Sequence, residues 1–184
     1  MNLFLSHDEE QKLLKLARDT IVLWVKNGTQ QEVPKESGLL IESLGVFVTL
    51  HKNGQLRGCI GCMVGRGPLI ETIRDMSIAA CSEDSRFDPV KESELALIDI
   101  EISVLSPLQT IDDINKIEVG KHGILMRCGF NQGVLLPHVA TEYGWDRETF
   151  LEHTCEKAGL PHDAWKDKET KIEIFSAQIF GEKK

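Results

Sequence analysis

The pair Asn53-Gly54 constrains the fold most, because it joins two segments with the composition of β-strands. VFVTLHK (46–52) precedes the pair and QLRGCIG (55–61) follows it. A two-residue type I′ turn needs positive φ at both central positions, which Asn and Gly adopt more readily than other residues. The sequence therefore predicts a β-hairpin closed by this turn.

A regular register in that hairpin fixes which side chains share a face. With Asn53-Gly54 as the loop, Leu50 is expected opposite Arg57 and Val48 opposite Cys59. Side chains alternate between the two faces of a strand. We therefore expect Arg57 and Cys59 on one side of the ribbon and His51 on the other.

The rest of the chain alternates between helical and strand patterns. Helices are predicted after the cap Ser6, after Gly67-Pro68, and from the cap Asp146 to Gly159. Further strands are predicted at 98–104 and 171–180, with a second hairpin whose turn is centred on Phe130-Asn131-Gln132. Hairpin connections favour antiparallel pairing, so we expect an α+β fold with mainly antiparallel sheets and packed helices. No linker divides residues 1–184, so any two sub-domains should pack intimately.

Composition excludes several classes of partner. The net charge of −8 opposes nucleic acid as the main partner, since phosphate binding needs clustered Lys and Arg. No apolar run reaches the roughly 20 residues of a membrane span, and the N-terminus lacks a secretion-signal pattern. We therefore expect no membrane partner, a cytoplasmic protein and mostly reduced cysteines. No dinucleotide or phosphate-loop fingerprint occurs, so no cofactor is expected.

The segment LRGCIG (56–61) is where chemistry is expected. A guanidinium near a thiol favours the thiolate, so Arg57 beside Cys59 suggests a nucleophile. Gly58 and Gly61 would leave the approach open, and backbone N–H groups there could hold a developing anion. The alternative is a structural bulge with an inert, buried cysteine.

Other polar residues give weaker indications of a site. Cys59 and Cys62 have CxxC spacing, but no second close pair of ligands supports a metal site, and none is predicted. A dithiol usually opens a helix, whereas this pair closes a strand. His138, after GVLLP, is a candidate base at a strand-to-helix transition, and Arg86 in SRFDP is a candidate anion-binding group.

These segments resemble the AMMECR1 family. LRGCIG is the family's hallmark hexapeptide, and SRFDPV, EISVLSP and GVLLPHVATEYGWDRETFLEHTCEKAGLP are similar to family motifs in the same order. The resemblance runs from about residue 8 to the C-terminus. Residues that match family positions, and are taken as binding residues beside Arg57 and Cys59, are Leu56, Gly58, Ile60, Gly61 and Arg86. Two positions depart from it: Cys62 replaces a residue that is commonly not cysteine, and His138 stands where many relatives have glutamine.

The resemblance implies a larger and a smaller sub-domain with the hexapeptide near a cleft between them. It implies no settled activity, but it suggests a modification system shared with a Memo-like protein and a radical-SAM enzyme. One hypothesis is therefore an enzyme with Cys59 as nucleophile, Arg57 and His138 assisting, and an unknown small-molecule substrate. The rival is a binding or adaptor module that docks a small molecule or protein through the same motif.

Overall fold

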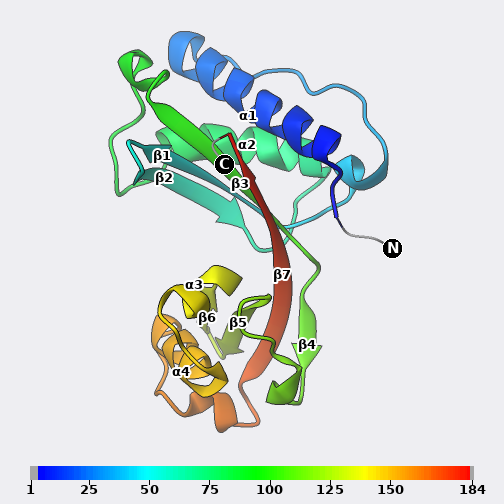
Figure 1. Ribbon diagram of the computed structural model, residues 1–184, viewed down its shortest axis with the longest axis vertical. Coiled ribbons are helices and arrows are strands. Elements are labelled where there is room, and N and C mark those ends of the chain that lie inside the picture. The colour runs from blue at the N-terminus through cyan, green and yellow to red at the C-terminus, as the bar shows by residue number, and fades with distance from the viewer. Residues whose placement is uncertain (1–3, 183–184) are drawn as a thin grey trace. The chain divides into compact units, whose positions relative to one another are not determined.

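The computed structural model describes residues 4–182, which form two compact units. Unit 1 comprises the described residues up to Leu105 together with those from Gln178 onward, and unit 2 comprises residues 106–177. Both units combine helices with antiparallel strands (Figure 1). The predicted α+β class is confirmed, and the predicted cleft between sub-domains stays a prediction.

Unit 1 is a sheet covered by two long helices (Figure 1). The sheet order is β2 (Gln55–Cys62), β1 (Val46–Lys52), β3 (Ile98–Leu105), all antiparallel. Helix α1 (His7–Asn27) and helix α2 (Leu69–Ser82) pack on one face. The inward side chains of β1 are fully buried at Val46, Val48 and Leu50. The alternate side chains of β1 are only half-buried, so the two faces of this sheet are chemically distinct.

The β1–β2 register differs from the predicted one. The turn forms as expected, with positive φ at Asn53 and Gly54. A β-bulge then shifts the pairing between Leu50 and His51, so that Leu50 lies opposite Gly58 and Thr49 opposite Cys59. The predicted pairs of Leu50 with Arg57 and Val48 with Cys59 are therefore wrong, because a bulge inserts one extra residue into β2.

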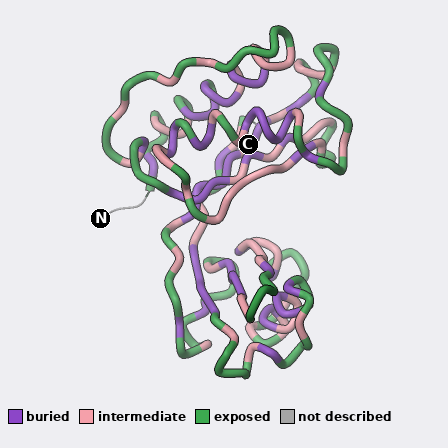
Figure 2. Tube along the Cα trace, turned by 180° about the vertical axis from the view of Figure 1, so that it is seen from behind, coloured by how far each residue is buried: buried purple, intermediate pink, exposed green. Residues whose placement is uncertain are grey.

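Unit 2 consists of antiparallel strands and two helices. Strand β5 (His122–Cys128) pairs with β6 (Asn131–Leu135) and with β7 (Lys171–Gly181), and β7 pairs with β4 (Gln109–Ile111). Helices α3 (Pro137–Glu142) and α4 (Arg147–Lys157) accompany the sheet. Its core contains Phe150, Leu151 and Cys155, all fully buried. Each unit thus has its own core, and buried residues concentrate along the strands and inner helix faces (Figure 2).

Most predicted element ends are confirmed by the caps. Ser6 and Glu9 form a capping box at the start of α1, and Asp146 caps α4. The predicted turn at residues 130–132 is wrong, because the two-residue turn is Gly129-Phe130 and Cys128 pairs with Asn131. Pro68 is the N-cap of α2 rather than its first residue. Within residues 4–182, no helix has the length and apolar character needed to cross a bilayer.

Candidate functional site

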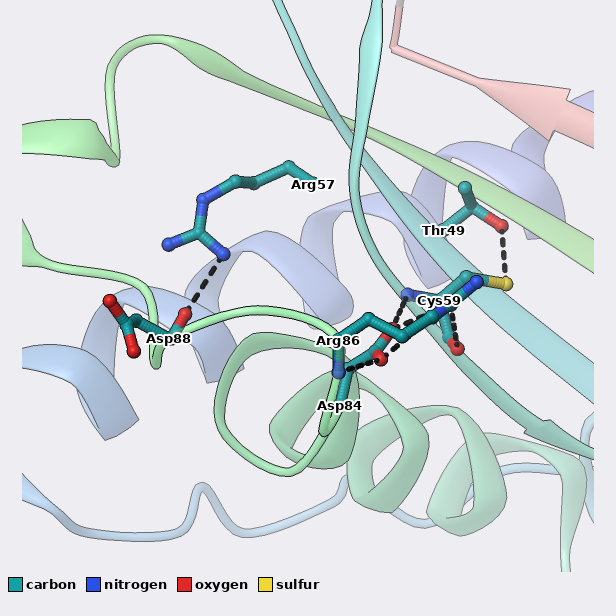
Figure 3. Close-up of polar contacts among 6 residues, drawn as sticks. All are labelled: Thr49, Arg57, Cys59, Asp84, Arg86 and Asp88. Atoms are coloured by element: carbon teal, nitrogen blue, oxygen red, sulfur yellow. Dashed lines mark hydrogen bonds and ion pairs between the residues drawn. The ribbon is translucent and has the colours of Figure 1, made fainter.

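Arg57 lies in an ion-paired clamp that ties β2 to the segment before β3. Its Nε and Nη2 atoms donate to both Glu94 oxygens at 3.1 and 2.9 Å, and Lys52 Nζ reaches Glu94 Oε1 at 2.7 Å. Arg57 Nη1 also donates to the Asp88 carbonyl at 3.0 Å (Figure 3). The Arg57 guanidinium, followed by Lys52, holds the pKa of Glu94 well below its usual range. Arg57 is thus engaged in a bidentate pair that fixes the strand.

Asp84 and Arg86 cap the free edge of β2 at Cys59. Asp84 Oδ2 accepts the Cys59 N–H at 2.8 Å, and Arg86 Nη2 donates to the Cys59 carbonyl at 3.3 Å (Figure 3). Asp84 is buried, and its pKa is strongly lowered, chiefly by hydrogen bonds from Arg86. The pair supplies the acceptor and donor that a neighbouring strand would offer to an edge residue. The Cys59 N–H is therefore already bonded.

The Cys59 side chain lies on the half-exposed face of the sheet. Its Sγ accepts a hydrogen bond from the Thr49 hydroxyl at 3.2 Å, so both side chains of this cross-strand pair point to the same side. Arg57 instead contacts Glu94 and lies 5.9 Å from the Phe87 ring centre. Arg86 is thus the arginine bonded to the Cys59 backbone. The thiol itself contacts Thr49, and Arg57, predicted to lie beside the thiol, is bonded to Glu94.

The glycines of the hexapeptide are sites of close packing. A Cβ at Gly58 would overlap the Ala80 carbonyl oxygen of α2. A Cβ at Gly61 would overlap the Val46 carbonyl oxygen and the Phe47 ring. These contacts show why only glycine fits, and they assign Gly58 and Gly61 a structural role in place of the expected open approach.

The spacing of Cys59 and Cys62 does not suit a disulfide. Both lie on strand β2, three residues apart and on opposite faces. A strand rises about 3.3 Å per residue, which separates their Cα atoms by roughly 10 Å. Disulfides require Cα atoms within about 7 Å. All five cysteines are free thiols, and no group of three potential metal ligands occurs within residues 4–182.

The remaining predicted residues are distributed as follows. Leu56 is exposed, and Ile60 packs against the unit 1 core. His138 is the second residue of α3, in unit 2, whereas Cys59 belongs to unit 1. His153 of α4 stacks on Trp145 with ring centres 3.9 Å apart. Local sequence reasoning missed Thr49, Asp84 and Glu94, which bond to the hexapeptide from distant positions.

Fold and site together define an α+β protein whose half-exposed cysteine lies on a hairpin strand fixed by two arginine–carboxylate pairs. The chain belongs to the AMMECR1 family, whose model matches residues 14–180. A protein from Methanothermobacter thermautotrophicus is 44% identical over 97% of this chain and 96% of its own length. A protein from Thermococcus onnurineus is 45% identical over 92% and 88%. The crystal structure of uncharacterised protein PH0010 from Pyrococcus horikoshii superposes with a TM-score of 0.89 at 40% identity, covering 97% of this chain and 94% of that one.

Proposed function

We propose that the hexapeptide forms a thiol-dependent site in which Cys59 is the nucleophile of a modification reaction. The observation that carries this proposal is the set of contacts at Cys59. Its N–H, carbonyl and Sγ each have a partner, from Asp84, Arg86 and Thr49 respectively, while its side chain stays partly accessible. A hydroxyl that donates to sulfur favours the thiolate. A fixed, accessible thiol is what nucleophilic catalysis requires.

The other cysteines provide the contrast. Burial raises the pKa of the Cys81 thiol to about 11, and it also raises the pKa of Cys155. Both are fully enclosed, so they are expected to be inert. Cys128 is partly accessible and lies in unit 2, which makes it an internal reference for reactivity.

The proposed ligand, partners and location rest on the similarity to the AMMECR1 family. A small molecule is the proposed ligand, with exposed Leu56 and the half-exposed Arg86 side chain beside Cys59 as its contacts. The proposed partners are a Memo-like protein and a radical-SAM enzyme, and the proposed location is the cytoplasm. His138 is kept as a proposed assisting residue, although it lies in unit 2.

The competing function is a binding or adaptor module. The bidentate Arg57–Glu94 pair favours it, because Arg57 is held in a structural clamp and not directed at the thiol. In such a module the exposed surface around Leu56 would dock a partner, and Cys59 would serve only as a small residue. The two functions differ in one property, since catalysis needs a thiolate and docking does not.

Iodoacetamide alkylation at pH 7, followed at each cysteine by mass spectrometry, tests the proposal. We expect Cys59 to react about tenfold faster than Cys128, because a stabilised thiolate is the reactive species. Thr49→Val should slow Cys59 severalfold, whereas Thr49→Ser, which keeps the hydroxyl, should retain the rate. Equal alkylation rates at Cys59 and Cys128 would contradict the proposal that Cys59 is a nucleophile, and the binding or adaptor function would then be favoured.

A further inference from the structure

The β-bulge at Arg57 brings Cys59 onto the same face of the sheet as a histidine. In a regular register Cys59 would lie opposite Val48, a fully buried core residue. With the bulge, Cys59 lies opposite Thr49, and His51 is two residues further along β1 on the same face. We propose that His51 is the proton acceptor for the Cys59 thiol, which names a further residue of the proposed thiol site and rests on that function.

Sheet geometry places the two side chains within reach of each other. Cys59 and His51 are diagonal neighbours across an antiparallel pair, and such neighbours are roughly 7–8 Å apart, within reach of longer side chains. The observed Thr49–Cys59 hydrogen bond of 3.2 Å fixes the side on which the sulfur lies. Both His51 and Cys59 are half-exposed. The bulge therefore places Cys59 and His51 on one accessible face of the sheet.

Strand β3 adds a residue to orient the imidazole. Asp99 is the register partner of His51, and Glu101 is the register partner of Thr49. Nucleophile, base and carboxylate thus come from three adjacent strands, β2, β1 and β3. An orienting carboxylate holds the base in the required tautomer and stabilises the imidazolium that forms. Asp99 is the positioning residue of this arrangement.

A hollow adjoins His51 and Asp99, the proposed base and its positioning residue, whereas Cys59 is not part of its lining. His51, Asp99 and Glu101 line a cavity of about 180 Å³ within unit 1, together with residues at the turn and at the end of β7. The base therefore faces an open volume, in which a bound group could approach the sheet face.

The proton transfer is chemically balanced. The thiol proton moves to an imidazole nitrogen of His51, leaving a Cys59 thiolate and a His51 imidazolium. Within residues 4–182, Asp99 and Glu101 of β3 lie on the same face as this pair, and Asp84 and Arg86 bond to the Cys59 backbone. Carboxylates beside an imidazole stabilise its cation, and a guanidinium beside a thiol stabilises its anion, an effect that the Asp84 carboxylate at the Cys59 backbone opposes. Histidine is the side chain best suited to accept a proton near neutral pH.

The test measures Cys59 alkylation by iodoacetamide from pH 5.5 to 9 in the wild type and in His51→Gln. At pH 7 we expect His51→Gln to lower the Cys59 rate about tenfold, because it removes the cation that stabilises the thiolate. The difference should shrink toward pH 9, where hydroxide suffices to ionise an ordinary thiol. Asp99→Asn should lower the rate less than His51→Gln does. Cys128 should react equally in all variants.

His7→Gln is the matched control, because His7 is an exposed histidine of the same unit. His51→Asn repeats the test with a smaller side chain, and the thermal midpoint of each variant reports folding. Cys59 rates in His51→Gln within about twofold of wild type at every pH would overturn the role of His51. If wild-type Cys59 reacts no faster than Cys128, the proposed function itself fails. If Cys59 is alkylated fast in both the wild type and His51→Gln, only the role of His51 as proton acceptor is rejected, and the proposed thiol function stands.

Discussion

The two tight hairpins of this protein differ in one respect that decides where the chemistry lies. Both β1–β2 and β5–β6 are closed by two-residue turns. The β5–β6 pairing runs through five residue pairs without a shift, whereas β1–β2 shifts by one residue at Arg57. In β5–β6 the turn alone sets which side chains share a face. In β1–β2 the bulge moves Cys59 from the buried face of Val48, where a regular register would place it, to the accessible face.

The cause of the difference lies at the free edge of β2. The Arg57–Glu94 pair and the Asp84–Cys59 hydrogen bond both tie β2 to segments outside the hairpin. The Cys59 N–H points away from β1 toward Asp84, and the Arg57 guanidinium bonds Glu94, which Lys52 at the end of β1 also bonds. Side-chain clamps can therefore outweigh the regular ladder that a type I′ turn favours.

The largest expected effect comes from filling the space at the bulge. Gly58→Ala should destabilise the protein by about 3 kcal/mol, because its Cβ meets the backbone oxygen of Ala80, which has little freedom to move. Gly133→Ala should have a similar cost in the other hairpin, where the Cβ meets the backbone of Ala158. Urea unfolding measures both changes.

Gly67→Ala is the control for these glycine variants. No atom lies within 4 Å of a Cβ there. We expect a change within about 0.5 kcal/mol, as for an ordinary surface substitution. A Gly58→Ala protein as stable as Gly67→Ala would show that the bulge can relax and that close packing does not hold it.

A smaller effect is expected from opening the Arg57 clamp. Glu94→Gln should cost about 2 kcal/mol at pH 7, because it weakens charged hydrogen bonds to Arg57 and Lys52. The pKa of Glu94 is lowered in the folded state. The stability that ionised Glu94 contributes is therefore fully present above about pH 4.3, the pKa of glutamate in the unfolded chain. It is lost as the pH falls through the lower pKa of Glu94 in the folded state.

Acid titration of the unfolding free energy sharpens this prediction. The wild type should lose more stability below about pH 4.3 than Glu94→Gln does. Glu92→Gln is the matched control, since Glu92 is exposed and its pair with Lys26 spans 3.5 Å. Such surface pairs contribute about 1 kcal/mol or less. Identical acid dependence in wild type and Glu94→Gln would mean that the clamp does not stabilise the fold.

The Asn53-Gly54 turn, the caps and the final strand could be predicted because their signals are local. Asn53-Gly54, Ser6 and Asp146 each act on residues within a few positions. The hexapeptide could likewise be singled out from its own letters. Its partners could not, because Glu94 lies 37 residues from Arg57 and Asp84 lies 25 residues from Cys59. No local sequence pattern marks either carboxylate. The sequence therefore does not indicate the bulge or the face of the sheet on which the Cys59 side chain lies.

The smallest effects on stability are expected at the two hairpin turns. They distinguish a residue needed for its backbone conformation from one that is merely exposed at a turn. Asn53 has φ of 53°, so Asn53→Ala should cost about 1 kcal/mol in left-handed backbone strain. Phe130 is fully exposed at the other turn, so Phe130→Ala removes little buried surface and should change stability by less than about 0.5 kcal/mol. Urea unfolding of both variants makes the comparison. A larger loss at Phe130 than at Asn53 would contradict it, and it would mean that the aromatic ring, not the glycine before it, stabilises the second turn.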